Sequence, residues 1–329
     1  MNTRMEVSLG LWQDRPAEEA LQTATLADRL GFQALWIGEM ATYDACALGM
    51  AVAARTERIS LTLGPFAVAV RDPMMIAMGV ASVASLSGRT VDVALGTSSQ
   101  VVVEEWHGRS RARSARALAE SARALRPLLD GEKSSLDGEV VRSRGYHLRL
   151  PAPKSSLTVA AFGPSAIRTA ARYADRMVLN LVSVETVRAL ISELRREAAA
   201  LDRSCPRVAV WLSAAVDAGK PAIDQIRRAV VGYLAAPGYS EMFERAGFGD
   251  VVAYARTRPH PRDLLARVPD ELVAAVSVVG DRDQARARVE AYIDAGVDDI
   301  VFLPSATDVD PAGERTLRTL AGLFPNTLA

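Results

Sequence analysis

Residues 58–109 contain the pattern that most restricts how this chain can fold. Two short apolar runs, at 59–64 and 91–95, each have the length and composition of a buried β-strand. Between them, the segment 73–85 starts at a proline, carries no charged residue and is rich in small residues, which is typical of a helix packed on a sheet. A strand, a helix and a second strand joined by short turns predict a parallel β-α-β crossover.

The same order of elements recurs towards both ends of the chain. A helix pattern over 17–30 stops at Gly31 and is followed by an apolar strand pattern. Near the C-terminus, Asp281 opens a sequence that resembles a capping box, and the helix that it begins leads into another strand. Strands are predicted at 6–11, 34–38, 59–64, 91–95, 157–162, 176–181, 207–215 and 300–303, with further helices at 44–55, 73–85, 112–129, 165–173 and 184–201.

Eight strands that alternate with helices predict an α/β fold of the (β/α)8 TIM-barrel class. An open, doubly wound sheet that binds a dinucleotide is the alternative, but no G-x-G-x-x-G follows any predicted strand. A chain of 329 residues suits one large barrel. We therefore expect residues 1–329 to form a single barrel domain.

Two segments do not fit the repeat and are predicted to be insertions. Residues 131–156 hold two short strand-like runs around Arg144-Gly145, which predicts a hairpin before the fifth strand. Residues 217–280 form a long, mainly helical segment that is broken at Pro237-Gly238 and at later glycines and prolines. Long insertions in a barrel usually cover one end, so we expect this segment to shape a substrate pocket.

Composition argues against nucleic-acid and membrane partners. The chain has 39 basic and 39 acidic residues, so its formal net charge is 0. The longest uncharged stretch, 74–88, is shorter than the ~20 residues of a membrane span, and charged residues interrupt the N-terminus before any signal-like run. Cys46 and Cys205 lie far apart and are expected to be reduced thiols. These features predict a cytoplasmic protein.

Motifs that would carry catalysis without a cofactor are missing. The sequence contains no H-E-x-x-H, C-x-x-C, G-x-S-x-G or G-x-x-x-x-G-K-[ST], and its three histidines are widely separated. If the chain is an enzyme, a bound cofactor is expected to supply the difficult chemistry while the protein orients it.

Barrel active sites lie at the C-terminal ends of the strands, where this chain often places glycine beside a polar residue. Gly163-Pro164-Ser165, after Phe162, could leave free N–H groups for a phosphate, or could be an ordinary helix cap. Gly64-Pro65 ends the third strand, where proline indicates a bulge or a cis bond unless the strand simply stops there.

Several ionisable or hydroxyl side chains follow these strands. Glu39 could accept a hydrogen bond from a ring N–H or orient a neighbour, or could form a salt bridge with an arginine at the barrel mouth. Glu104 and Glu105 could be acid–base groups or the edge of an acidic loop. His107 is the histidine nearest the predicted mouth, and a functional role for it competes with a merely structural one.

These residues also carry a family resemblance. The run Ala27-Asp-Arg-Leu-Gly-Phe-Gln-Ala-Leu-Trp-Ile-Gly-Glu39, with Arg71-Asp-Pro73, Leu86-Ser-Gly-Arg89 and Ala94-Leu-Gly-Thr97, resembles the luciferase-like monooxygenase superfamily. Within it, the chain is most similar to the actinobacterial branch that uses the deazaflavin coenzyme F420. The likeness covers nearly the whole chain and is weakest over 217–280.

The resemblance implies a barrel with a flavin-type ring at its mouth. The ring would be backed by an irregular third strand, which maps to Gly64-Pro65, and the cofactor phosphate would be held around Phe162 and Gly163 to Ser165. Thr97 and Ser98 would lie near the ring or its side chain. The family is expected to form homodimers.

The sequence departs from the sugar-phosphate dehydrogenases of this family at two places. Those enzymes carry Asp-His after the second strand and a glutamate soon after the fourth, whereas this chain has Glu39-Met40 and Ser99. Methionine cannot act as a general base, which argues against that sugar oxidation.

Three functions remain open. The preferred one is an F420-dependent oxidoreductase acting on a small organic substrate, in which Glu39, Thr97, Ser98 and Ser99 orient the reactants and His107 or Glu105 donates a proton. The second is an FMN-dependent monooxygenase. The third is a barrel that binds a flavin or another ligand without turnover.

Overall fold

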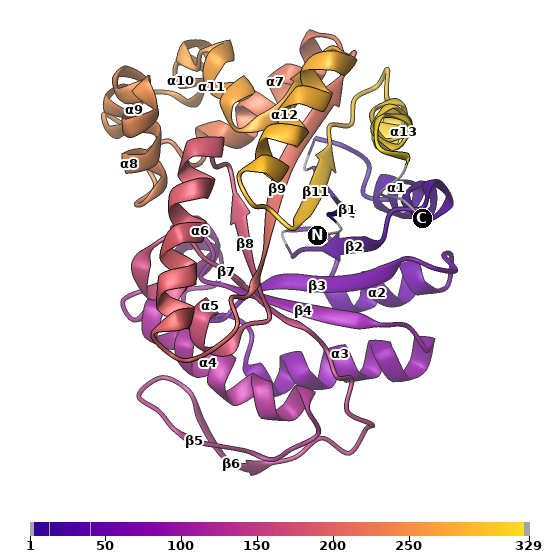
Figure 1. The fold of residues 1–329 in the computed structure, drawn as a ribbon, viewed down its shortest axis with the longest axis vertical. Helices are drawn as coiled ribbons and strands as arrows, with labels where there is room; N and C mark the ends of the chain where they lie inside the picture. Colours follow the sequence, from indigo (N-terminus) through magenta and orange to yellow (C-terminus); the bar gives the residue numbers. More distant parts are fainter. Residues whose placement is uncertain (1–2, 13, 40, 326–329) are drawn as a thin grey trace.

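Eight parallel strands close into a barrel in the computed structural model, which describes residues 3–12, 14–39 and 41–325 (Figure 1). Pairing between β8 and β9 closes the ring. The predicted (β/α)8 TIM barrel is therefore confirmed. Its strands are β1 (Arg4–Ser8), β2 (Ala34–Ile37), β3 (Ser60–Ala67), β4 (Val91–Gly96), β7 (Leu157–Ala160), β8 (Arg176–Asn180), β9 (Arg207–Val216) and β11 (Asp299–Pro304).

A ninth strand, β10 (Ser277–Gly280), was not predicted. It pairs in parallel with residues 213–216 of β9, while β8 pairs with residues 207–211 and β11 with residues 209–214. Because β11 overlaps both of the others, β8 and β10 lie along the same edge of β9, one beyond the other. The prediction that the helical insertion runs to 280 is thus wrong at its end, since a four-residue strand gives too short a pattern to stand out.

Helices cover the outside of the barrel, and most begin within two residues of their predicted positions. The capping box predicted at Asp281 is present, because the Asp281 carboxylate accepts the N–H of Gln284 and the Gln284 side chain accepts the N–H of Asp281. These helices are α1 (Glu19–Leu30), α2 (Ala45–Ala53), α3 (Pro73–Ser87), α4 (Ser114–Leu129), α5 (Pro164–Tyr173), α6 (Val184–Ala199), α12 (Arg282–Asp294) and α13 (Glu314–Leu323).

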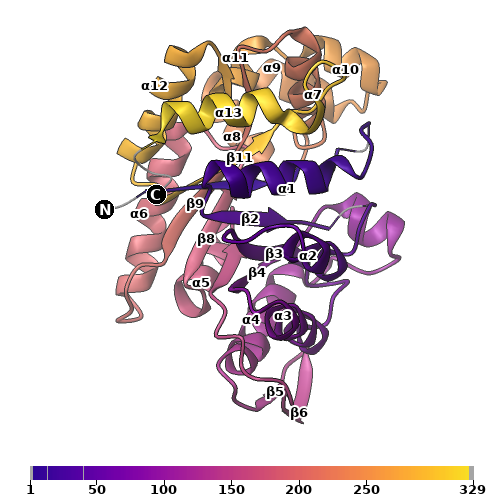
Figure 2. The ribbon, with the colours of Figure 1, turned by 90° about the vertical axis from the view of Figure 1, so that its right-hand side faces the viewer.

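Residues 131–156 and 217–275 fold outside the repeat and lie at opposite ends of the molecule (Figures 1 and 2). The first segment forms the antiparallel pair β5 (Ser134–Asp137) and β6 (Arg142–Tyr146). Its chain reverses at 138–141, where Glu120 accepts backbone N–H groups, so Arg144-Gly145 lie inside β6 and not in the turn. The second segment contains α7 (Lys220–Val231), α8 (Tyr239–Phe243), η2 (Glu244–Phe248), α9 (Gly249–Arg256), α10 (Pro261–Arg267) and α11 (Asp270–Ala275).

Two further predictions concern the end of the first strand and the state of the two cysteines. β1 ends at Ser8, three residues before its predicted end, and Leu11 beyond it has a left-handed backbone (φ 45°). Cys46 and Cys205 are both free thiols. Of the described helices, none is long and apolar enough to cross a membrane.

The barrel interior is layered along its axis. Trp36, Ala94, Val178, Ala209 and Val301 pack together in the middle layer. Below them, towards the N-terminal ends of the strands, the buried Arg176 side chain contacts Glu6 and Asp299. Since side chains alternate along a strand, the residues two positions beyond the middle layer face the interior at the mouth.

Candidate active site

One side of the barrel mouth is lined by glycine. Gly38 and Gly96 lie two residues beyond the inward-facing Trp36 and Ala94, and Gly64 lies two beyond the inward-facing Thr62. A Cβ placed on Gly38 would meet only the Gly64 carbonyl oxygen, at 3.9 Å. Of the three glycines, only Gly38 faces open space, because a Cβ on Gly64 would lie 2.3 Å from the Ala94 carbonyl oxygen and one on Gly96 would lie 3.2 Å from the Pro65 Cβ atom.

Gly64-Pro65 is irregular in the way the sequence predicts. Their peptide bond is cis, and the register between β3 and β4 shifts between Leu63 and Phe66. Gly64 has φ +108°, and a Cβ there would lie 2.3 Å from the Ala94 carbonyl oxygen. Only glycine fits this position.

The opposite side of the mouth is aromatic and polar. Phe162, Asn180 and Trp211 lie two residues beyond the inward-facing Ala160, Val178 and Ala209. Trp211 stands edge-on to Trp36, with ring centroids 5.5 Å apart at 86°, and its Nε1 atom is buried with no hydrogen-bond partner. This donor is covered by neighbouring protein atoms and is left unpaired.

The helical insertion is fixed to this aromatic side. Tyr239 at the start of α8 stacks on Phe162, with ring centroids 4.6 Å apart, and contacts Tyr233 at 4.9 Å. Gly238 makes this approach possible, because it has φ +85° and a Cβ there would lie 2.8 Å from the Phe162 ring. Burial raises the pKa of Tyr239, against a side-chain hydrogen bond with Asn180 that lowers it, so the phenol stays protonated at neutral pH.

Glu39 forms the salt bridge that was its alternative interpretation. Its carboxylate accepts hydrogen bonds from the Arg71 guanidinium and, at 3.1 Å, from the backbone N–H of Ala45. Arg71 also pairs with Asp44, the N-cap of α2. Glu39 therefore ties the end of β2 to the start of α2. Met40 lies outside the described residues.

Three polar residues follow β4 without facing deep into the barrel. Thr97 is partly buried, whereas Ser98 and Ser99 are exposed. Ser98 has a left-handed backbone (φ 57°), and its carbonyl oxygen accepts a hydrogen bond from Arg111 at 2.8 Å. The Ser99 hydroxyl accepts the Val102 N–H at 3.2 Å and so caps η1 (Val101–Trp106), which leaves the hydroxyl proton available.

The other acid–base candidates lie on the surface around η1. Glu104, Glu105 and His107 are all exposed. The Glu104 carboxylate accepts the backbone N–H of Arg111 at 3.2 Å. The structure places these side chains on the loop after the mouth and shows no buried acid–base pair among them.

The anion site is predicted at the N-terminus of α5. Gly163 is the N-cap and provides no side chain to bond the first turn, and a Cβ on it would meet nothing within 4 Å. Ala166 and Ile167 donate their N–H groups to the Gly163 carbonyl oxygen. The Arg168 guanidinium donates to the Ser165 hydroxyl at 3.0 Å, which adds a positive charge beside this helix end. The site is open and electropositive.

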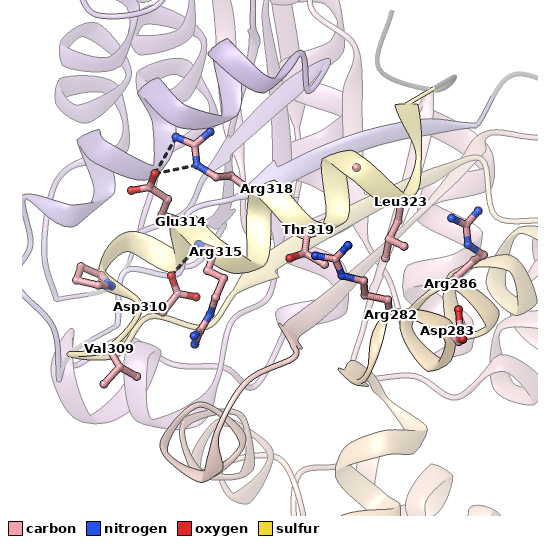
Figure 3. A pocket seen from close by; sticks show the side chains of 12 residues that line it. Arg282, Asp283, Arg286, Val309, Asp310, Glu314, Arg315, Arg318, Thr319 and Leu323 are labelled. Atoms are coloured by element: carbon pink, nitrogen blue, oxygen red, sulfur yellow. Dashed lines mark hydrogen bonds and ion pairs between the residues drawn. The ribbon is translucent and has the colours of Figure 1, made fainter.

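A large cavity lies away from the mouth. It is a groove of about 800 Å³ between α12 and α13, on the outside of the barrel (Figure 3). Arg282 and Arg315 extend into it, while Arg318 pairs with Glu314. None of the residues predicted to be functional lines it, so its size alone does not make it the reactive centre.

Sequence reasoning found the glycine side of the mouth and missed most of the other side. Trp211 and Tyr239 were not predicted, and Asn180 was seen only as a strand end. Counting inward positions from an assigned strand would have identified Trp211. Tyr239 gave no such signal, because its position depends on how the insertion folds back.

The full sequence matches known proteins over nearly its whole length. A sequence model of the family described as "Luciferase-like monooxygenase" matches residues 2–299. The 5,10-methylenetetrahydromethanopterin reductase of Methanolobus tindarius is 23% identical over 318 residues, covering 93% of this chain and 95% of the reductase.

Solved structures show the same fold at low identity. The coenzyme F420-dependent tetrahydromethanopterin reductase of Methanopyrus kandleri superposes with a TM-score of 0.81 at 18% identity, covering 99% of this chain and 100% of the other. An F420-dependent secondary alcohol dehydrogenase, solved with an F420–acetone adduct, gives a TM-score of 0.79 at 16% identity, with full coverage of both chains.

Proposed function

This chain belongs to the luciferase-like monooxygenase family, and from this we propose that it is an F420-dependent oxidoreductase. In the proposed reaction, a hydride passes between the deazaflavin and a small organic substrate. A relative named as a 5,10-methylenetetrahydromethanopterin reductase and two structural neighbours that depend on F420 support this cofactor.

The observation that carries the proposal is the glycine-lined half of the mouth. A flat ring needs a wall with few side chains; Gly38, Gly64 and Gly96 end three neighbouring strands without one, and the space beside Gly38 is open. The rigid bulge at Gly64-Pro65 would support the ring from behind. These residues fit a flavin-type ring, and F420 bound there would supply a carbon that donates or accepts hydride.

The remaining proposed contacts lie around this wall. Thr97 and Ser98 would contact the cofactor beside the ring, and the first turn of α5 would bind its phosphate with help from Arg168. Glu39 would act through Arg71 by fixing the loop between β2 and α2. Phe162 would contact the ligand from the opposite side, where it is held by Tyr239.

Two of the proposed catalytic residues would act at the rim of the mouth. Ser99 keeps a hydroxyl proton that it could donate, and His107 could carry a proton from solvent. Both side chains are exposed, so their roles depend on a ligand that extends out of the barrel.

We further propose that the protein is a single-domain, cytoplasmic homodimer. The two free thiols are consistent with a reducing compartment. Light scattering of the purified protein measures its mass in solution, and a monomer at micromolar concentration would contradict the dimer.

Titration with F420 and with FMN tests the function. Ring absorbance and fluorescence should show saturable F420 binding, and reduced F420 should be reoxidised when a substrate is added. Tight binding of FMN without a response to F420 would instead indicate the FMN-dependent monooxygenase. Binding without any substrate-dependent redox change across a panel of carbonyl and alcohol compounds would favour a barrel without turnover.

A further inference from the structure

Asn180 is the last residue of β8 and ends this strand at the barrel mouth. We propose that its side-chain amide selects the substrate, by donating a hydrogen bond to the oxygen of an uncharged, largely apolar organic molecule such as a ketone or an alcohol. The inference rests on the proposed function and extends it to the class of the substrate.

The contacts of β8 fix the direction of the Asn180 side chain. At alternate positions along this strand, Arg176 reaches Glu6 across the interior and Val178 packs in the middle layer. Side chains alternate along a strand, so Asn180 points to the same side, one step nearer the mouth. The next residue, Leu181, has a left-handed backbone (φ 51°), so the strand ends directly after Asn180.

A ligand can reach Asn180 from the mouth. The middle layer lies below it and is closed, because its residues, which come from five strands, are at most 4% exposed. Asn180, in contrast, keeps part of its surface exposed. Since the closed layer blocks the interior from below and the neighbouring strands enclose it at the sides, this exposed surface opens to the mouth.

The open space beside Gly38 lies across the barrel from Asn180. In the ring of eight strands, β2 and β8 are four strands apart in either direction, so the ends of these two strands face each other. A cofactor ring on the glycine side would therefore turn its free face towards Asn180. A substrate must lie on that face to exchange a hydride with the ring.

The other side chains of the mouth define the class of the ligand. Phe162, Trp211 and Leu303, which lies two residues beyond the inward-facing Val301, are partly exposed and apolar. The Trp211 Nε1 atom is covered, so this ring presents only carbon to a ligand. Ser8, the last inward residue of β1, is buried. None of these described inward residues carries a charge, so a charged group on the substrate would lose its water without gaining a partner.

An amide suits a neutral oxygen atom. The Asn180 side chain shares one hydrogen bond with the Tyr239 hydroxyl. An asparagine amide has two N–H donors and an acceptor oxygen, so at least one donor remains for a ligand. Because the amide does not ionise, it can hold a carbonyl or hydroxyl oxygen but cannot supply a proton.

Three probes built on the same ring test this class of substrate: cyclohexanone, cyclohexanecarboxylate and cyclohexylammonium. Each is titrated into the protein saturated with F420, and saturation-transfer NMR gives its Kd. We expect cyclohexanone to bind at least about tenfold more tightly than either ion, because only the ions lose strong hydration. Equal binding of an ion, absence of ketone binding, or displacement of F420 by the ketone would overturn the inference.

Two substitutions test the residue itself. Asn180→Leu removes the donor at similar volume, so the Kd of cyclohexanone should rise by about twofold to tenfold, the effect of one neutral hydrogen bond. Asn180→Asp keeps the shape and adds a negative charge, so cyclohexylammonium should become the preferred probe. Tyr239→Phe is the matched control, since it breaks the same bond with Asn180 and leaves the amide in place. It should share any loss of Tm with Asn180→Leu but not the rise in Kd.

The results separate this inference from the proposed function. If the wild type binds F420 and both Asn180 variants keep its order of probes and its Kd for cyclohexanone, the inference is wrong and the proposed function stands. If the wild type does not bind F420, the proposed function fails, and the same titrations of the free protein decide whether Asn180 selects the ligand. If Asn180→Leu does not fold, the order of probes in Asn180→Asp decides alone.

Discussion

The two ends of the barrel interior are built on opposite principles. At the bottom, the ionisable groups are buried and bonded to one another: Arg176 donates to Glu6 and Asp299 and, on its other sides, to Thr62 and Thr158. At the mouth, Gly38 leaves open space and the buried Trp211 N–H has no partner. The protein completes one end with its own side chains, whereas the other end is where we propose that the ligand binds.

The charged bottom also supports the mouth. Glu6 accepts from Trp36, Arg176 packs on the Trp36 ring, and Trp36 supports Trp211. Asp299 receives a second guanidinium, that of Arg207. A continuous series of contacts thus runs along the barrel axis from a sealed end to an open one.

The largest expected effect is on stability, from Arg176→Ala at the sealed end. The substitution removes the guanidinium that the buried Glu6 and Asp299 side chains share. This loss should lower the free energy of unfolding by about 3–5 kcal/mol. Urea denaturation measures this change. Arg318→Ala is the control, because it breaks an exposed pair with Glu314 and should cost less than about 1 kcal/mol. Equal losses in the two variants would show that the bottom is not a sealed network.

Gly64→Ala tests the backbone of the open end. The added methyl group would lie 2.3 Å from the Ala94 carbonyl oxygen on a backbone with φ +108°, so we expect a loss of about 3 kcal/mol. Gly88→Ala is the matched control, since Gly88 also has a positive φ (+68°) but a Cβ there would meet nothing within 4 Å. That variant should lose about 1–2 kcal/mol of unfolding free energy, because alanine is strained at a positive φ. A difference near zero would mean that the Gly64 site relaxes around the methyl group.

Gly38→Leu tests the space itself. A side chain there would project into the mouth and meet little protein, so the free energy of unfolding should change by less than about 0.5 kcal/mol. Binding of F420 should nevertheless be lost, because the leucine occupies the proposed ring site. Gly322→Leu provides the control in the groove between α12 and α13, where the glycine Cβ position is also open. If the groove variant loses F420 binding and the mouth variant does not, the cofactor site has been assigned to the wrong cavity.

The features that could be predicted from sequence were those with a local cause. The helix start at Pro73 followed from the proline itself and that at Asp281 from capping chemistry, and the irregularity at Gly64-Pro65 followed from a proline where a central strand should donate an N–H. Strand alternation with helices was enough to identify the barrel.

The features that were missed depend on contacts between distant segments. β10 is too short to be recognised alone and forms because β9 extends beyond β8 and offers it a free edge. Tyr239 reaches the mouth only because Gly238 lets α8 approach Phe162. Glu39 could be placed near the mouth, but its pairing with Arg71 rather than with a ligand required the structure.

The smallest expected effect is on the pH dependence of stability. There, Glu6 in the barrel interior and Asp28 on a surrounding helix act in opposite directions. Burial raises the pKa of Glu6 and outweighs the attraction of Arg176, so the native state binds a proton at a pH where the unfolded chain, with a pKa of about 4.3, has lost it. Stability from this group is present below that value and falls as pH rises through the native pKa.

Asp28, in the last turn of α1, has the opposite effect on the pH dependence of stability. Burial acts to raise its pKa, but the N–H groups of Glu57, Ile59 and Arg58 together lower it, so its contribution is present above about pH 4 and is lost as pH falls. The free energy of unfolding should therefore have its maximum on the acidic side of neutrality. Urea denaturation at a series of pH values between about 3.5 and 8 measures this maximum. Glu6→Gln should flatten the decline on the alkaline side of the maximum, and Asp28→Asn the decline on its acidic side. A wild-type profile that rises steadily up to pH 8 would show that the Glu6 carboxyl is ionised in the folded barrel, and that the sealed end behaves as a charged network throughout.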